Sequence, residues 1–246
     1  MTFDYPAIVA QQTEAILAIA RRTGPSAGVP PCPGWDLAAL CGHLGRVQRW
    51  ATTAVVTGSS PEGGFGPPPP AGDEALTYLA DSVNPLVNAL GALSAERDGW
   101  TFVGNNASGR FWPRRQAQEA LIHRWDAESA AGSPGDFDPD VAADGLDEAL
   151  TTLASFRLKN RKGDLPSLSG SLHLHATDAT SEWMIDAPGG SVRISPTHGK
   201  GDAALRGTAS DLLLFVWRRL DPNHPGFESF GDRSIVDEFY NWKLLG

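Results

Sequence analysis

The sequence predicts a mainly α protein, in which an up-and-down bundle of four or five helices is followed by a small α+β domain. Two observations predict this fold class. Apolar residues recur at helical spacing through the first two thirds of the chain. After a charged segment that also bears proline and serine, at 159–169, the alternation typical of strands replaces that spacing. We therefore expect the bundle to span residues 1–162 and the α+β domain residues 163–246.

The first two helices have recognisable ends in the sequence. A helix is expected over 4–22, and Gly24 with Pro25 should stop it. Asp36 is placed to cap a second helix, which continues towards Trp50. This cap supplies an oxygen for backbone N–H groups that have no partner inside the helix.

The next two helices each contain a proline. A loop is expected at 59–72, which is rich in proline and glycine, and a third helix after it. Pro85 should kink or break that helix near Asn84, because proline cannot donate a backbone hydrogen bond. A fourth helix is expected over 113–130, with Pro113 suited to its first turn.

A fifth helix and the α+β domain complete the prediction. Asp138-Pro139-Asp140 should open a helix that reaches Phe156. Strands are expected around 172–176, 183–185 and 192–194, with a turn at 188–190 between the last two. Helices are expected over 208–219 and 234–245.

Charge and composition restrict the function. The formal net charge of −9 and the lack of a basic run argue against a nucleic-acid binder. No stretch approaches the roughly 20 apolar residues that span a bilayer. The first residues lack the features of a signal peptide, and two cysteines cannot form a disulfide framework. We therefore expect a cytoplasmic, reduced protein with no nucleic-acid or membrane partner.

The strongest chemical signal is a pair four residues apart, Glu119 and His123. On a helix they lie one turn apart on the same face, and the apolar residues around them suggest burial. A surface contact is the ordinary explanation of this spacing, but a buried Glu beside a His needs something that satisfies both, and a divalent cation does so. His43 lies on the core side of the second helix and is the candidate third ligand. Two histidines and one carboxylate, with one position open, form a ligand set of catalytic zinc sites.

Other polar residues are weaker candidates. Asp126 lies one turn beyond His123 and could orient a ligand or accept a proton, although a solvated carboxylate is an equal alternative. His173 and His175 could chelate from one strand face, but a polar outer sheet face explains them without a metal. Cys32 could be a redox thiol, yet a small buried hydrophobe is the better default for Cys32 and Cys41.

Two motifs resemble those of a known family. The run Val-Pro-Pro-Cys-Pro-Gly-Trp-Asp at 29–36, continued by His43, and the run Glu-Ala-Leu-Ile-His-Arg-Trp-Asp-Ala-Glu at 119–128 are similar to motifs of the mycothiol-dependent maleylpyruvate isomerase family. The segments 207–212 and 231–233 are similar to its C-terminal domain. The resemblance implies a DinB-like helical bundle that holds a divalent metal, usually zinc, followed by a small α+β domain.

The resemblance also implies roles for single residues. It makes His43, Glu119 and His123 the metal ligands, in agreement with their spacing, and it implies an arginine of the C-terminal domain near the active site. Arg219 is the best match, with Arg218 beside it. Arg219 and Asp126 are therefore the predicted catalytic residues, whereas the residues that bind mycothiol cannot be assigned.

The expected activity is a metal-dependent, mycothiol-dependent isomerisation of the maleylpyruvate type or a thiol S-transfer. A metal-bound thiol loses its proton near neutral pH, so its thiolate could add to an activated double bond. The expected partners are a small electrophilic substrate and a low-molecular-weight thiol, and the chain is expected to be a monomer or a homodimer. A metal-dependent hydrolase and a non-catalytic metal- or ligand-binding protein are the alternatives.

Overall fold

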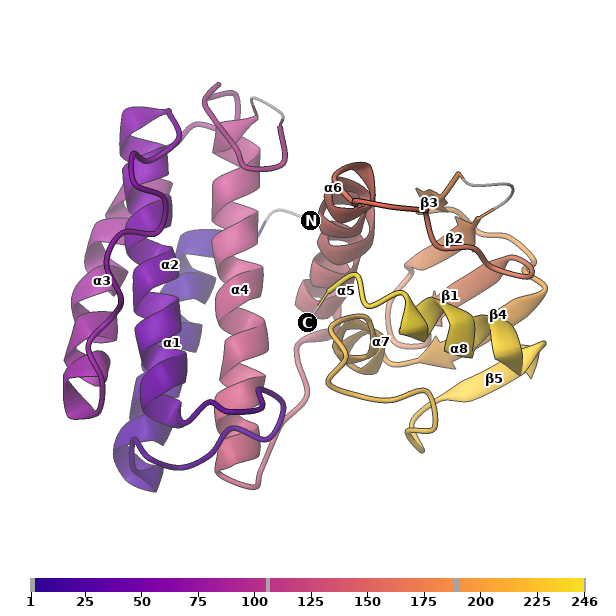
Figure 1. The fold of residues 1–246 in the computed structure, drawn as a ribbon, viewed down its shortest axis with the longest axis horizontal. Coiled ribbons are helices and arrows are strands. Elements are labelled where there is room, and N and C mark those ends of the chain that lie inside the picture. The colour runs from indigo at the N-terminus through magenta and orange to yellow at the C-terminus, as the bar shows by residue number, and fades with distance from the viewer. Residues whose placement is uncertain (1–2, 105–106, 188–190, 246) are drawn as a thin grey trace. The chain divides into compact units, whose positions relative to one another are not determined.

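The structure is a computed structural model that describes residues 3–104, 107–187 and 191–245. The chain divides into two compact units, Met1–Gly135 and Asp136–Gly246, which are considered separately (Figure 1). The predicted fold class is confirmed, because four long helices precede a small unit with a five-stranded sheet. None of the described helices is long and apolar enough to cross a membrane.

The described part of the first unit contains four helices, which lie side by side in Figure 1: α1 (Tyr5–Thr23), α2 (Leu37–Thr57), α3 (Asp73–Gly91) and α4 (Ser108–Ala130). The predicted cap of the second helix is confirmed, since the Asp36 carboxylate accepts a hydrogen bond from the backbone N–H of Ala39 at 2.8 Å. Asp4 caps α1 in the same way through the N–H of Ala7. Both caps satisfy orphan donors at the start of a helix.

Prolines disturb the helices less than the sequence suggested. Helix α3 continues through Pro85, so the expected break near Asn84 does not occur. Leu86 and Leu90 beyond the proline are buried, and this burial stabilises the last turns of α3 although Pro85 cannot donate a backbone hydrogen bond. Helix α4 begins at Ser108, before the expected start at Pro113.

The first unit also contains a buried polar link between three helices. Gln48 of α2 donates from its side-chain amide to Thr13 of α1 and accepts from Ser82 of α3, at 3.0 and 2.7 Å. All three side chains are buried. Each polar group thus obtains a partner that water would otherwise supply, and the link restricts how the helices align.

The helical segment after the bundle belongs to the second unit. It runs through α5 (Pro139–Asp147), a π-helical stretch η1 (Glu148–Ala154) and α6 (Ser155–Lys159). Helix α5 packs against α7 (Ala209–Val216), and the backbone N–H of Phe137 donates to Ser210 Oγ at 3.1 Å. The boundary between units therefore lies near residue 135, earlier than the expected boundary at 162/163, because this helix packs with the sheet unit.

The sheet has the order β3-β2-β1-β4-β5. Its strands are β1 (Leu172–Ala176), β2 (Glu182–Asp186), β3 (Arg193–Ser195), β4 (Ala203–Gly207) and β5 (Glu228–Gly231). Strand β1 pairs with β2 in antiparallel and with β4 in parallel orientation. The first three strands agree with the predicted alternation, and the turn expected at 188–190 lies outside the described residues. Strands β4 and β5 were not predicted, because β4 is rich in small residues and β5 is exposed along its length.

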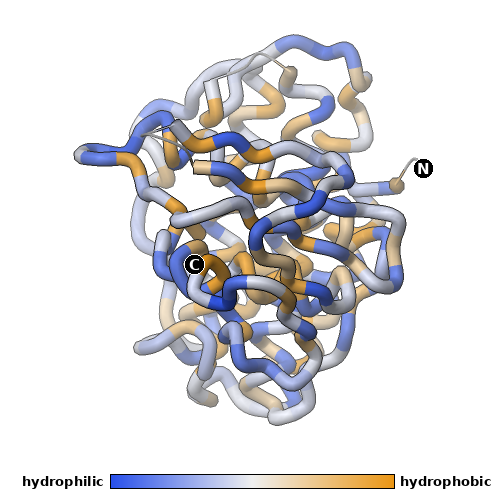
Figure 2. Tube along the Cα trace, turned by 90° about the vertical axis from the view of Figure 1, so that its right-hand side faces the viewer, coloured by the Kyte–Doolittle hydropathy of each residue, from blue (hydrophilic) through white to orange (hydrophobic). Residues whose placement is uncertain are grey.

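Residues of the sheet alternate between a buried and an open face. Leu172, Leu174, Trp183, Ile185 and Leu205 are buried and share one face with each other through the strand register. Helix α7 and helix α8 (Arg233–Asn241) contact strands of this sheet. Figure 2 shows the resulting alternation of hydrophobic and hydrophilic residues along the trace. The opposite face carries His173, His175 and Glu182.

Candidate metal centre

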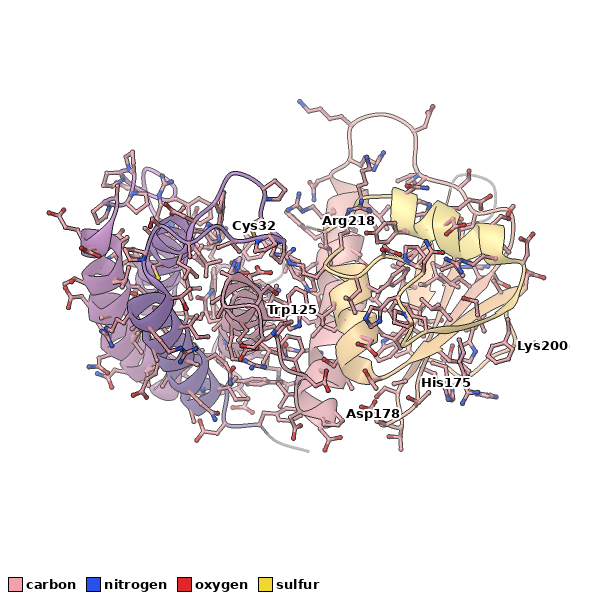
Figure 3. The ribbon with its side chains drawn as sticks, turned by 90° about the horizontal axis from the view of Figure 1, so that it is seen from below. Cys32, Trp125, His175, Asp178, Lys200 and Arg218 are labelled. Atoms are coloured by element: carbon pink, nitrogen blue, oxygen red, sulfur yellow. The ribbon has the colours of Figure 1, made fainter. Side chains whose placement is uncertain are left out.

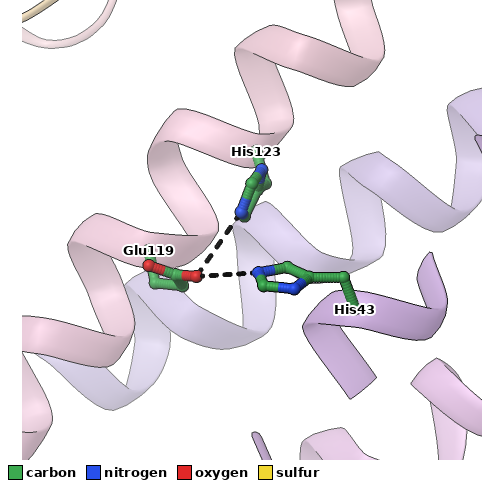
Figure 4. Close-up of side chains that lie close together, drawn as sticks. All are labelled: His43, Glu119 and His123. Atoms are coloured by element: carbon green, nitrogen blue, oxygen red, sulfur yellow. Dashed lines mark hydrogen bonds and ion pairs between the residues drawn. The ribbon is translucent and has the colours of Figure 1, made fainter. Parts of the chain in front are cut away.

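The three residues predicted as ligands converge between α2 and α4 (Figure 4). One oxygen of Glu119, Oε1, lies 3.3 Å from His43 Nε2 and 3.4 Å from His123 Nε2. The three candidate ligand atoms all lie within 4.8 Å of one another. Residues that are far apart in sequence therefore present two imidazole nitrogens and one carboxylate oxygen to a common point.

These separations agree with the geometry of a metal site. Zinc binds nitrogen and oxygen ligands at about 2.0–2.2 Å, so two ligands of a tetrahedral ion lie about 3.4 Å apart. The distances from Glu119 Oε1 to the two imidazole nitrogens are 3.3 and 3.4 Å. The donor set also suits zinc chemically, because neutral imidazole and carboxylate are both ordinary zinc ligands. The residues present therefore fit a divalent ion.

The segment before α2 positions His43. It forms a tight turn in which the Val29 N–H donates to the Trp35 carbonyl at 2.9 Å and the Trp35 N–H donates to the Cys32 carbonyl, also at 2.9 Å. Gly34 adopts a φ of 85°, which side chains with a Cβ rarely tolerate. Asp36 then caps the helix that carries His43. The motif thus determines where α2 begins and which face of it points to α4.

Arg115 controls the orientation of the Glu119 carboxylate. Its guanidinium donates to Glu119 Oε2 at 3.2 Å, which leaves Oε1 directed at the histidines. Burial raises the pKa of Glu119, but hydrogen bonds from His123 and His43, with the charges of His123 and Arg115, outweigh burial and hold that pKa well below its usual range. Glu119 is therefore a carboxylate, which is the form that binds a cation. Sequence reasoning missed Arg115, although its position four residues before Glu119 on the same helix was a signal.

Asp126 orients His123 from the other side. Its Oδ2 lies 2.9 Å from His123 Nδ1, and Asp126 is completely buried. A carboxylate at Nδ1 favours the tautomer that leaves the lone pair on Nε2, the nitrogen that faces Glu119. Burial lowers the pKa of His123, but the hydrogen bonds with Asp126 and Glu119 and their charges raise it to about 9, so an ion that binds Nε2 would displace a proton from that nitrogen. The alternative of a solvated Asp126 is thus wrong.

Cys32 and Trp35 complete the surroundings of the histidines. Cys32 donates from its thiol to Asp126 Oδ2 at 3.5 Å, so it has a polar contact that its interpretation as a simple hydrophobe did not include. The Trp35 ring lies 4.9 Å from the ring of His43 and 6.3 Å from that of His123, between centroids. Sequence reasoning had not assigned Trp35 to the site, although it stands in the recognised motif.

Access to the cluster is uneven. The His43 side chain is 36% exposed, whereas those of Glu119 and His123 are 18% and 9% exposed. Solvent therefore reaches the cluster from the His43 side, while the His123 side is closed by Asp126. A ligand or substrate would approach an ion from that open side.

The predicted arginines lie in the second unit, just after α7. Arg218 adopts a φ of 63°, and its guanidinium carbon lies 4.2 Å from the ring centroid of Tyr240. Arg219 donates to the Trp217 carbonyl at 2.9 Å. Arg218 is therefore fixed by the C-terminal helix of its own unit. The proposed role of Arg219 stays a prediction.

Fold and cluster together define a class of two-unit proteins, with a four-helix bundle that carries two histidines and a carboxylate and a small mixed-sheet unit after it. Family models match both units: the mycothiol maleylpyruvate isomerase N-terminal domain over residues 7–128 and the corresponding C-terminal domain over 140–238. The chain belongs to the mycothiol-dependent maleylpyruvate isomerase family.

Solved structures have the same fold. The crystal structure of the mycothiol-dependent maleylpyruvate isomerase is 15% identical, with a TM-score of 0.59, and the match covers 93% of this chain and 95% of that one. A variant of that isomerase with one histidine replaced by alanine is 13% identical, with a TM-score of 0.61 and the same coverage. A search of curated proteins finds no match.

The two cysteines should differ in reactivity towards an aromatic disulfide at pH 8. Burial raises the pKa of Cys41 to about 12, and this residue is fully buried, so its thiolate is scarce and inaccessible. Cys32 is only partly buried. We expect Cys32 to be the one fast-reacting thiol of the native protein. Native Cys32→Ser protein should have no fast-reacting thiol, and both thiols of the unsubstituted protein should react after denaturation. Reaction of Cys41 in native Cys32→Ser protein at the rate of the denatured chain would contradict this assignment.

Proposed function

We propose that the chain is a zinc-dependent enzyme that uses mycothiol to isomerise a maleylpyruvate-type substrate, or to transfer the thiol to another small electrophile. The convergence of His43 and His123 on Glu119 Oε1 is the observation that carries the proposal. Membership of the family supports the thiol and the isomerase chemistry. A cytoplasmic location fits the use of a low-molecular-weight thiol and two reduced cysteines.

Each residue of the bundle site has a distinct task in this proposal. His43, Glu119 and His123 would hold the ion, which would lower the pKa of a bound thiol so that a thiolate is present at neutral pH. Asp126 keeps the Nε2 lone pair of His123 directed at the ion, and is a positioning residue. Arg115 prevents Glu119 from rotating away. The more exposed His43 side leaves room for the thiol and the substrate.

Arg219 would supply the positive charge that an acidic substrate needs. The protein is negatively charged overall, at −9, so an anionic substrate requires a local cation. A guanidinium can bind a carboxylate through two parallel hydrogen bonds and stabilise negative charge that develops on the neighbouring carbonyl. We therefore propose that Arg219 binds the substrate carboxylate. Arg218 would instead stabilise the end of its unit through Tyr240.

A metal-dependent hydrolase is the alternative within catalysis, because the same three ligands and one open position would also activate water. A non-catalytic protein would be expected to have a fourth protein ligand at this centre. The exposed His43 side favours an open position over such a closed one.

The metal assignment predicts the loss of bound ion in three single variants. His43→Ala, Glu119→Ala and His123→Ala should each lower the zinc content of untagged protein by about one equivalent per chain, because a site with two ligands left binds weakly. Elemental analysis measures the content, and circular dichroism checks the fold. His224→Ala is the matched control, since His224 lies in a loop of the second unit and contacts Gly226.

Asp126→Asn should lower zinc affinity less than the loss of a ligand does. It keeps the size of the side chain but removes the charge behind His123, so zinc affinity should fall about 10- to 100-fold while the fold persists. Unchanged zinc content in all three ligand variants would overturn the site.

The thiol dependence is tested by a panel of mycothiol, glutathione, bacillithiol and no thiol, each with maleylpyruvate and with other electrophiles. Isomerisation of maleylpyruvate is expected with mycothiol, because a thiolate must add and leave for the double bond to rotate. Thiol consumption with other electrophiles but no isomerisation would identify an S-transferase. Turnover without any thiol would contradict the proposal and favour the hydrolase.

Arg219→Ala should lower kcat/KM for a carboxylate-bearing substrate about 100-fold, which is typical of the loss of one group that stabilises developing negative charge. Zinc content should not change, since Arg219 is not a ligand. Arg157→Ala is the control, because Arg157 is an exposed arginine of α6. An unaltered kcat/KM in Arg219→Ala would remove Arg219 from the active site.

A further inference from the structure

We propose that the second unit contains its own zinc site, formed by His173, His175 and Glu182 on the open face of the sheet, with His198 in contact with Glu182. The proposal concerns a different unit from the bundle site and does not depend on the proposed enzyme function. It reverses the expectation from the sequence that the two strand histidines form only a polar sheet face.

The ligand atoms of this cluster lie close together. Glu182 Oε2 lies 2.8 Å from His173 Nε2 and 2.6 Å from His198 Nδ1, and Glu182 Oε1 lies 3.1 Å from His175 Nδ1. Atoms of His173, His175 and Glu182 all lie within 4.8 Å of one another. Three imidazoles thus surround a single carboxylate.

Strand pairing produces this arrangement. His173 and His175 are two residues apart on β1, so both point to the same face. In the antiparallel ladder His175 stands opposite Glu182 of β2, and His173 stands opposite Met184. The pairing therefore places the carboxylate directly beside both imidazoles, which strand alternation alone could not reveal.

The loop after β3 adds a further contact to Glu182. A Cβ on Gly199 would lie 3.0 Å from the Met184 sulfur, so the loop lies against the open face of the sheet. His198, in this loop, reaches Glu182. Figure 3 shows His175 of β1 and Lys200 of this loop on the side of the unit away from α8. His173 is only 8% exposed.

Two imidazoles and a carboxylate at close range are a donor set that a divalent cation binds. A divalent ion satisfies neutral imidazoles and the carboxylate at once. Imidazole and carboxylate ligands suit zinc, and the three protein ligands would leave one position of a tetrahedral ion for water or another ligand. Such an ion would fix the Glu182 carboxylate, and with it the contact from His198 that holds the 196–201 loop to the sheet.

The test uses full-length Glu119→Ala protein, in which the bundle site is disabled, titrated with Zn²⁺ by calorimetry after treatment with a chelator. We expect about one equivalent of Zn²⁺ to bind. In the double variant Glu119→Ala/His175→Ala the affinity should fall about 100-fold, because one of the principal ligands is gone. His198→Ala in the same background should weaken binding less, since the side chain of His198 is 85% exposed.

Glu119→Ala/His224→Ala is the matched control and should bind Zn²⁺ like the Glu119→Ala protein. Hydrogen exchange provides a second readout, because Zn²⁺ should slow the exchange of backbone amides at 197–201 when the site is intact. The proposal is overturned if Glu119→Ala protein binds no Zn²⁺, or if its binding and its amide protection survive His175→Ala unchanged. Hydrogen bonds from neutral imidazoles to Glu182 would then explain the cluster.

Discussion

The bundle site depends on the carboxylate of Glu119, which joins two helices that are distant in sequence. Its Oε1 faces both His43 of α2 and His123 of α4, while its Oε2 is held by Arg115. A carboxylate buried to this degree is costly unless its partners compensate it. The two histidines that compensate the buried carboxylate are also the groups that would bind a cation with it. The same arrangement of side chains therefore stabilises the fold and forms the candidate site.

The two recognised motifs both supply residues that surround Glu119 and the two histidines. The motif at 29–36 places Cys32 on Asp126, Trp35 against both histidines and Asp36 at the start of α2. The motif of α4 supplies Asp126, one turn beyond His123. The cysteine, the tryptophan and the aspartate of the 29–36 motif therefore each have a structural role of their own. Contact with a substrate is not needed to explain why these residues are there.

Sequence reasoning reached the fold class and the Glu119–His123 pair because both rest on short-range rules, since residues four apart on a helix share a face. His43 is distant in sequence, and it was a candidate ligand from its place on the core side of its helix and from the family resemblance. Arg115 obeys the same spacing rule, but it was missed because a cation was the one group considered as compensation for the buried carboxylate. The unit boundary and strands β4 and β5 could not be predicted in this way. They depend on the packing of α5 against α7 and on a parallel pairing of β1 with β4, both of which join distant segments.

The two histidine clusters show how secondary structure decides which side chains meet. On a helix, residues four apart share a face, so one motif contributes both Glu119 and His123 and a neighbouring helix adds the third group. On a strand, residues two apart share a face, and the remaining groups must come from the paired strand and from a loop. The helical cluster is therefore visible in the sequence as a spacing. The strand cluster requires the register of β1 with β2 and the path of the 196–201 loop, so only the folded chain reveals Glu182 and His198 as partners of His173 and His175.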